Sequence, residues 1–297
     1  MSYKPNKFEE ILMEENYYDS AAAIKLAYHA QLVMTYIFLT PYQHDNNGDS
    51  FRHCYWSSMI AKNTSPYWAF RWTNAHEQHQ SSENIRRRMD EHNNSIGINL
   101  IKNNPNLEAH DLMHLCLELV KTGKLKVIQN NTLVPSNLNG FILPNIFDVI
   151  KEAFNEVLDL IIKYYKELVL VRDSDSNTAL HRCILENYSY GFYALLESKI
   201  IDVNTPGLSG WSPLMVCSRE ANRVDFVRVL LGKNLNVDYQ EPIYGETALM
   251  MAAAYGNREI VELLLSRSNK KLKSFSGLTA YDKALAEEHT ELLGLLK

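Results

Sequence analysis

The sequence predicts an all-α protein, with a helical-bundle-like N-terminal domain followed by a short solenoid of repeated helices. Two observations lead to this prediction. Apolar residues recur at helical spacing through most of residues 1–170, and strand-like alternation is not sustained there. Beyond that region, a similar segment returns about every 33 residues. We expect a helical domain over 1–143, a long connecting helix over 144–171 and the repeats over 172–297.

Helix signals divide the N-terminal half into segments. Periodic or capped stretches predict helices over 8–39, 49–62, 66–92 and 105–121. Turn-forming residues precede the second segment, and a proline suited to a first helical turn begins the third. A short extended piece follows at 124–128. Residues 144–171 then read as one long amphipathic helix that joins the two halves.

The C-terminal repeat is marked by a hydroxyl residue at the start of each copy. These residues are spaced by 34, 35 and 32 positions and are Thr178, Ser212, Thr247 and Thr279. A hydroxyl at this place can cap the first helix of the copy by accepting from a free backbone N–H. The third copy, GETALMMAAAYGNREIVELLLSRS, is the clearest. The pattern resembles the ankyrin repeat, with about four copies and atypical terminal ones.

The ankyrin resemblance implies a function in binding. Such arrays have no chemistry of their own and present a concave surface to a protein partner. His181, at the family's usual histidine position, is interpreted as structural. A second interpretation remains open, in which the short array only packs against the N-terminal domain as a scaffold.

Composition excludes several classes of protein. The chain has 297 residues, a net charge of −5, 46% hydrophobic and 22% charged residues, which describe a soluble globular protein. The negative charge argues against a general nucleic-acid binder. The four cysteines form no C-x-x-C pair and are expected to be reduced, buried thiols. The apolar run 21–39 contains Lys25, His29 and Gln31, so we expect no transmembrane segment.

Polar residues gather at helical spacing in three successive segments. Asp49 and His53 are four residues apart and therefore share a helix face, with Arg52 and Trp56 beside them. The next segment has the pair His76-Glu77, and the third has Asp90 and Asn94, again four apart. Helices packed as a bundle can bring such faces together around one pocket.

These residues resemble a bacterial domain family of unassigned function. The similar pattern is D-x-x-R-H-x-x-W from Asp49, then His76-Glu77, then M-D-x-x-N-N-x-x-G from Met89, with GKL at 123–125. It covers about residues 40–130, departs from the family at Ser50, where alanine is expected, and implies no settled reaction. Together with ankyrin repeats, the architecture resembles secreted effectors of intracellular bacteria. That resemblance implies a host protein partner and export into the host cytoplasm without a classical signal peptide.

The residue types favour a metal-assisted hydrolase. Carboxylate and imidazole groups suit Zn²⁺ or a similar divalent ion, and the expected ligands are Asp49, His53, His76 and Asp90, with His79 in reserve. Glu77 could serve as the base for a bound water, and Asn94 completes the set of site residues. Arg52 could hold a phosphate through its planar fork. A phosphoester or phospholipid substrate follows from that role.

Two other interpretations of the polar residues remain open. One is a metal-free acid–base site that uses His53 or His76 with Asp90. The other is a closed network in which Asp49 caps its helix and His53 bonds to a carboxylate, so that the residues only hold the helices in register. In the second case the protein is a non-catalytic adaptor that acts through protein–protein binding alone.

Overall fold

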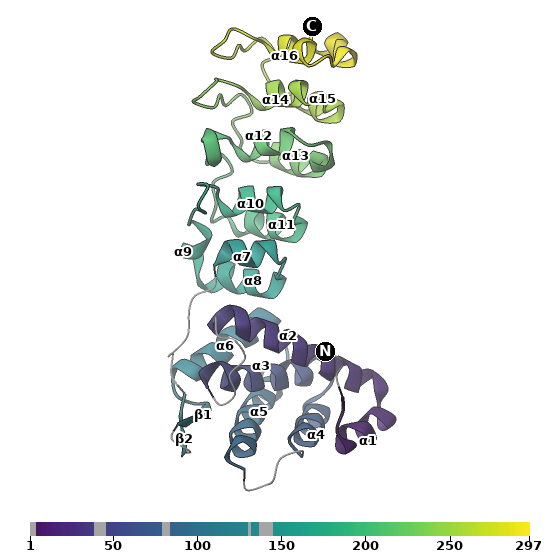
Figure 1. Ribbon diagram of the computed structural model, residues 1–297, viewed down its shortest axis with the longest axis vertical. Coiled ribbons are helices and arrows are strands. Elements are labelled where there is room, and N and C mark those ends of the chain that lie inside the picture. The colour runs from purple at the N-terminus through teal and green to yellow at the C-terminus, as the bar shows by residue number, and fades with distance from the viewer. Residues whose placement is uncertain (1–3, 39–45, 79–83, 130–131, 137–144) are drawn as a thin grey trace. The chain divides into compact units, whose positions relative to one another are not determined.

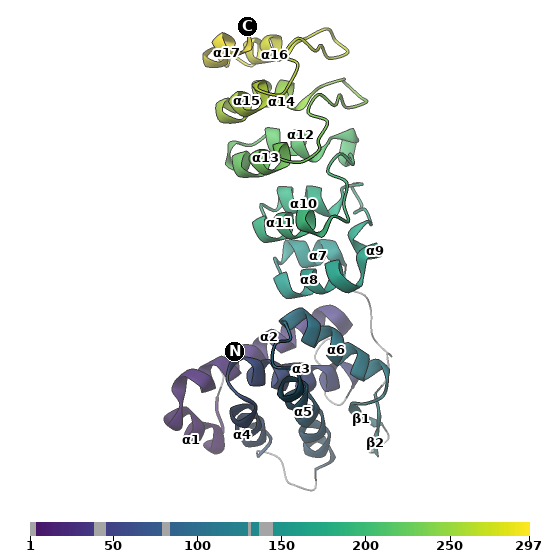
Figure 2. The same ribbon diagram turned by 180° about the vertical axis from the view of Figure 1, so that it is seen from behind.

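The protein divides into two compact units, Met1–Pro144 and Asn145–Lys297. The structure is a computed structural model that describes residues 4–38, 46–78, 84–129, 132–136 and 145–297 (Figure 1). The described part of each unit is mainly helical, which confirms the predicted fold class. The C-terminal unit is a stack of helix pairs, as both views show (Figures 1 and 2).

The described part of the N-terminal unit contains helices and one strand pair. In chain order they are α1 (Lys7–Glu15), α2 (Tyr17–Phe38), α3 (Asn47–Asn63), α4 (Pro66–Glu77), α5 (Ile85–Asn103), α6 (Ala109–Lys121), β1 (Lys126–Gln129) and β2 (Thr132–Pro135). The single helices predicted over 8–39 and 66–92 are wrong. Asn16 ends α1 in an extended conformation, and the Asn84 side chain caps the start of α5.

Helix α3 lies at the centre of this unit. It packs against α2, α4, α5 and α6, and each of its residues from 47 to 61 is buried. Many of these residues are polar. A buried polar side chain is stable only with hydrogen-bond partners, so the position of α3 forces its polar groups to find partners on the surrounding helices.

The extended piece after α6 is one strand of a β-hairpin. Gly123, at φ +70°, ends the preceding helix region in a left-handed conformation, and β1 pairs with β2 in antiparallel register. Asn93 of α5 fixes the hairpin, because its side chain donates to the Lys126 carbonyl at 3.0 Å and accepts from the Lys126 N–H at 2.9 Å. This strand pair is a small exception among the helices in the described part of the unit.

The C-terminal unit, described throughout, is made of short helices. They are α7 (Ile146–Lys151), α8 (Asn155–Tyr164), α9 (Lys166–Val169), α10 (Ala179–Leu185), α11 (Ser189–Ser198), η1 (Leu208–Gly210), α12 (Pro213–Ser218), η2 (Ala221–Arg223), α13 (Val224–Leu231), α14 (Ala248–Ala254), α15 (Arg258–Leu265), α16 (Ala280–Ala286), η3 (Thr290–Leu292) and α17 (Leu293–Leu296). The helices labelled η are single 3₁₀ turns. All four predicted hydroxyl caps are present. Each side chain accepts from the backbone N–H three residues later.

The predicted long connecting helix over 144–171 is wrong. Ala153 has φ +52°, a left-handed conformation that breaks the helix, so the segment folds into α7, α8 and the short α9. Asn145 caps α7, 33 residues before the cap Thr178. Helices α7 and α8 pack against α10 and α11 (Figure 1). The segment is therefore an additional helix pair at the beginning of the stack, which shields the apolar face of the first predicted repeat.

His181 joins two consecutive repeats. Its Nδ1 is 2.7 Å from the Thr178 hydroxyl, and its Nε2 is 3.0 Å from the Trp211 carbonyl. A carbonyl only accepts, so Nε2 carries the proton and Nδ1 accepts from the hydroxyl. Burial lowers the pKa of His181 to about 4, with Arg172 acting in the same direction and the bond to Trp211 opposing it. The structural role assigned to this residue follows from these bonds.

The pKa of His181 predicts how the stability of the C-terminal unit depends on pH. Its folded pKa lies below the unfolded value of 6.5, so the unfolded chain binds the proton more tightly. The stabilising contribution is complete above pH 6.5 and is lost as the pH falls towards 4, by at most about 3 kcal/mol. Urea unfolding of wild type and His181→Gln between pH 7.5 and 4 measures it. Equal pH slopes for the two proteins would contradict the prediction.

The cysteines are buried thiols. Cys54, Cys116, Cys183 and Cys217 are buried and form no disulfide, as expected. Burial raises the pKa of the Cys54 thiol, and the adjacent Cys116, with Sγ atoms 3.3 Å apart, raises it further. A thiol in this environment is a poor nucleophile. None of the helices in the described ranges has the length and apolar character needed to span a bilayer.

Candidate functional site

Helix α3 presents three of the predicted site residues on one face. The helix begins after Asn46, whose side chain accepts from the Asp49 N–H at 2.9 Å. Asn46 is therefore the cap, and the predicted capping role of Asp49 is wrong. The Asp49 side chain is instead turned toward the next turn of α3, where it meets Arg52 and His53. Asp49 and His53 are each only 2% exposed.

Helix α5 brings the second group of residues to α3. The two helices cross in close contact at Gly97, where an added Cβ would lie 2.1 Å from the Cys54 carbonyl oxygen. Only glycine permits this approach. As a result, Asn94 and Asp90, one and two turns before Gly97, face the polar side of α3.

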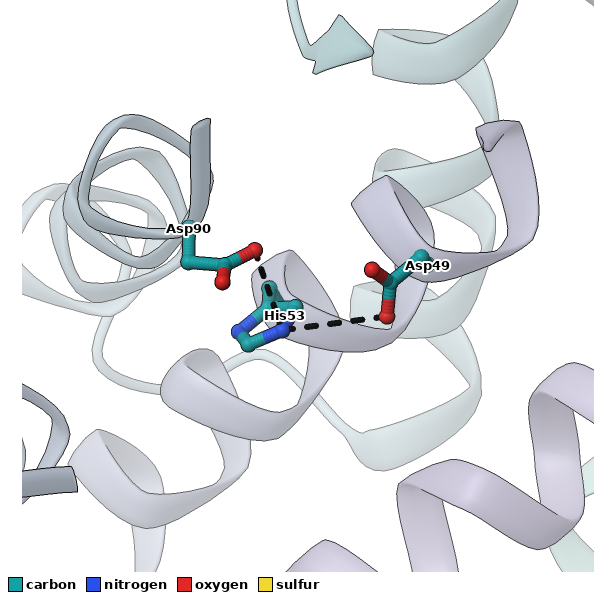
Figure 3. Close-up of side chains that lie close together, drawn as sticks. All are labelled: Asp49, His53 and Asp90. Atoms are coloured by element: carbon teal, nitrogen blue, oxygen red, sulfur yellow. Dashed lines mark ion pairs between the residues drawn. The ribbon is translucent and has the colours of Figure 1, made fainter. Parts of the chain in front are cut away.

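The imidazole of His53 lies between carboxylates (Figure 3). Its Nε2 is 3.2 Å from Asp90 Oδ1 and 3.7 Å from Asp49 Oδ1. On the other side of the ring, Nδ1 is 3.7 Å from Glu77 Oε1. Glu77 comes from α4 and accepts from the Asn94 amide at 3.3 Å. Helices α3, α4 and α5 therefore contribute to one buried group of polar residues, the polar cluster, which contains Asp49, Arg52, His53, Glu77, Asp90 and Asn94.

Arg52 is bound within this cluster. Its Nε and Nη2 donate to Asp49 Oδ1 at 3.0 and 2.7 Å, and Nη2 also contacts His53 Nε2. A guanidinium only donates, so Nε2 is the accepting nitrogen and the ring proton sits on Nδ1, towards Glu77. The Arg52 guanidinium thus serves as the shared cation for both Asp49 Oδ1 and His53 Nε2.

The environment keeps His53 neutral. Burial lowers the pKa of His53 well below 6.5, and the positive charge of Arg52 lowers it further. Asp49 and a hydrogen bond with Asn94 act in the opposite direction but do not overcome these causes. A neutral imidazole with an accepting Nε2 is the form that binds a metal ion or takes up a proton.

Three of the four predicted metal ligands come together. One donor atom from each of Asp49, His53 and Asp90 lies within 4.8 Å of the other two, while His76 is not part of this group. His76 Nδ1 is 2.7 Å from Glu9 Oε1, on α1, so its predicted place among the ligands is wrong in this structure. His79, the reserve ligand, lies outside the described residues.

Residues that the sequence analysis did not single out complete the surroundings. Glu9 is 2% exposed and accepts from the Asn6 backbone N–H at 2.7 Å. The Asn6 side chain also donates to the Ala75 carbonyl at 3.0 Å, which links α1 to α4. The capping box Asn6-x-x-Glu9 was a visible helix-start signal, but its contact with His76 was not. Trp56 donates to the Ala23 carbonyl and is 1% exposed, as expected of a core residue.

Two known families match this chain. Residues 10–124 match the family described as Domain of unknown function (DUF6973), and residues 180–274 and 214–297 match the family described as Ankyrin repeats (3 copies). The C-terminal unit therefore carries ankyrin repeats, which provide a protein-binding array. The N-terminal match contains the whole polar cluster but assigns no reaction to it.

Two curated relatives are similar to about half of this chain. Ankyrin repeat and SAM domain-containing protein 6 of Mus musculus is 32% identical over 158 residues, which are 49% of this chain and 18% of that protein. The protein of the same name from Rattus norvegicus is 31% identical over 158 residues, with the same shares. The chain thus spans less than a fifth of the length of these relatives.

Proposed function

We propose that the N-terminal unit is a metal-dependent hydrolytic domain, and that the ankyrin array directs it to a protein partner. The observation that supports this proposal most strongly is the convergence of Asp49, His53 and Asp90 from two helices on one point. Two donor atoms held by one ion at about 2.1 Å each can lie up to about 4.2 Å apart. The distances from His53 Nε2 to the two carboxylates, 3.2 and 3.7 Å, fall within that limit, and the Asp49 and Asp90 oxygens lie within 4.8 Å of each other, so binding would draw these two oxygens closer together.

The chemistry of the three donor atoms, from Asp49, His53 and Asp90, favours a cation bound between them. Two carboxylate oxygens and an accepting imidazole nitrogen have no proton to share among themselves, so they repel unless a positive charge lies between them. Arg52 now supplies that charge to Asp49 and His53. A divalent ion such as Zn²⁺ would take its place once the guanidinium turned away from both atoms. Glu77 would orient the imidazole through Nδ1, as carboxylates do for many metal-bound histidines.

Arg52 also suggests the substrate class. A guanidinium released from Asp49 would remain beside the ion as a second positive group, which suits a phosphoester. Glu77, predicted as the base for a bound water, lies on the Nδ1 side of the His53 ring, opposite Nε2, so it would orient the imidazole and would not reach a water on the ion. The predicted origin as an effector of an intracellular bacterium, exported to a host cell, stays part of this proposal.

A second candidate is supported by the burial of the cluster. Asp49, His53, Glu77 and Asp90 are between 1% and 5% exposed, and the Arg52–Asp49 pair closes the point where an ion would bind. In that case the cluster only fixes α3, α4 and α5 relative to one another, and the protein is an adaptor that acts through its ankyrin array.

Metal binding distinguishes the two candidates. Chelator-treated protein is titrated with Zn²⁺ by calorimetry, and the metal content of the untreated protein is measured by mass spectrometry. The proposal predicts one ion per chain, and about 2.7 kcal/mol of added stability at a free ion concentration 100 times the Kd. His53→Gln and Asp90→Asn should weaken binding at least 100-fold.

The control is His76→Gln, because His76 lies outside the ligand group and should leave binding intact. A diesterase screen with bis(p-nitrophenyl) phosphate then tests the reaction. Folded wild-type protein that binds no divalent ion and melts at the same temperature with and without chelator would favour the adaptor instead.

A further inference from the structure

An arginine held between two aromatic rings lies across the second and third ankyrin repeats. The Cζ atom of Arg219 is 5.0 Å from the centroid of the Trp211 ring and 5.3 Å from that of Tyr255. Arg219 directly follows the last residue of α12, and Trp211 lies just before the cap residue Ser212. Long helical side chains lean towards the N-terminus, so Arg219 extends back along α12 to Trp211. Tyr255 occupies the same place after α14 as Arg219 does after α12.

The guanidinium of Arg219 has no acceptor in the C-terminal unit, which is described throughout. Its Nε is buried without a hydrogen-bond partner, and its interactions there are the two ring contacts. The neighbouring Arg223 differs, because it donates to the Val216 carbonyl and pairs with Glu220 at 2.9 Å. Stacking on the two aromatic rings orients the guanidinium but does not use its N–H donors, which point outward in the plane of the guanidinium. Arg219 is therefore a fixed, partly buried cation whose terminal nitrogens, Nη1 and Nη2, are available to a partner.

Exposed apolar side chains lie on the loops of the same repeats. They are 53–69% exposed and occur once or twice in each of three successive loops: Leu208, Ile243, Tyr244 and Phe275. The loops are in contact, since an added Cβ at Gly210 would meet Pro242 and the Phe275 N–H donates to the Tyr244 carbonyl at 2.8 Å. We name these four residues the loop row.

Charge and residue type identify the kind of partner. Trp, Tyr and Arg are the residues that most often dominate the energy of a protein interface, and here one of each is already assembled. The pocket in the last repeat is lined by Lys270, Lys271 and Lys273, so a second part of the array is also positive. A partner that neutralises Arg219 must present a carboxylate, and a partner that covers the loop row must present apolar side chains.

We propose that Arg219, clamped by Trp211 and Tyr255, is the main binding residue of the ankyrin array, and that it receives an Asp or Glu of an extended protein segment with apolar neighbours. The carboxylate accepts two parallel hydrogen bonds from the guanidinium. The apolar neighbours cover the loop row. This binding does not depend on any chemistry in the N-terminal unit.

A displayed library of random dodecapeptides, selected on the full chain, tests the proposal. Selected peptides should share an Asp or Glu next to apolar residues, and the best one is then synthesised with a fluorophore for polarisation measurements. Arg219→Ala should weaken its binding more than 30-fold. Arg219→Lys should weaken it at least fivefold, since lysine keeps the charge but loses the planar fork.

The matched control is Arg258→Ala. Arg258 is an exposed arginine of α15 that pairs with Glu262 along its own helix, so its removal changes the net charge equally and should leave the Kd unchanged. Circular dichroism confirms that each variant is folded. Failure to select acidic peptides, or equal losses in Arg219→Ala and Arg258→Ala, would overturn the proposal.

Discussion

Gly97→Ala is expected to destabilise the N-terminal unit by about 4 kcal/mol or more, above the 1–3 kcal/mol usual for one extra methyl group in a core. The added Cβ would lie 2.1 Å from the Cys54 carbonyl oxygen and 2.2 Å from Ser57 Oγ. A backbone oxygen cannot rotate away, so α3 and α5 must separate. Because His53 and Asp90 lie on these two helices, the separation also breaks the candidate metal site. Urea unfolding followed by circular dichroism measures the loss.

Gly48→Ala provides the control within the same unit. Gly48 lies in the first turn of α3, where an added Cβ would meet Asn46 Oδ1 and Met34 Cγ at 3.2 Å and Met34 Sδ at 3.3 Å. A methionine side chain is flexible and can yield, and alanine favours the helix by about 1 kcal/mol over glycine. The free energy of unfolding should therefore change little. If Gly97→Ala were as mild as Gly48→Ala, the close helix crossing would not exist in solution.

Asp49→Ala is expected to cost about 3–5 kcal/mol, because it leaves the buried Arg52 cation without its main partner. Arg52 is 8% exposed and directs both Nε and Nη2 at Asp49 Oδ1. The same change removes the negative charge of Asp49, which raises the pKa of His53, so the imidazole would accept a proton less readily. Unfolding is measured with chelator present, so that metal binding does not contribute to the difference.

The matched variant is the double change Asp49→Ala with Arg52→Met. Replacing a whole buried ion pair by apolar groups is often neutral or stabilising, whereas removing one member is costly. The double variant should therefore regain most of the stability that Asp49→Ala loses. An Asp49→Ala protein as stable as wild type would show instead that Arg52 reaches solvent and that the cluster is open.

The candidate site illustrates what helical spacing can predict. Asp49 and His53, four residues apart, lie on one face of α3 because each residue turns an α-helix by about 100°, and this local geometry was readable in advance. His76 and Glu77 are adjacent, so they diverge, and only Glu77 faces His53. His76 turns to Glu9 instead, which is 67 residues earlier in the chain. Nothing local to either residue indicates that contact.

The connecting segment shows that a helical pattern in the sequence can also predict too long a helix. Residues 144–171 have a continuous helical pattern, yet Ala153 breaks it in a left-handed conformation that alanine rarely adopts. The break allows α7 and α8 to fold as a pair against α10 and α11. The apolar area buried by this stacking outweighs the local preference for a longer helix, as tertiary packing commonly does.

The sequence by itself determined the helical class, the ankyrin caps at Thr178, Ser212, Thr247 and Thr279, and the faces on which polar residues lie. These features depend on interactions within about four residues, which periodicity and capping chemistry describe fully. The tertiary structure alone decided that Arg52 neutralises Asp49, that His76 leaves the ligand group and that Arg219 stacks between Trp211 and Tyr255. The first of these is a choice among partners within reach on one helix. The second joins His76 to Glu9, 67 residues earlier, and the third joins Arg219 to Tyr255 of the next repeat. For such distant partners, packing and desolvation, rather than spacing, select the contact.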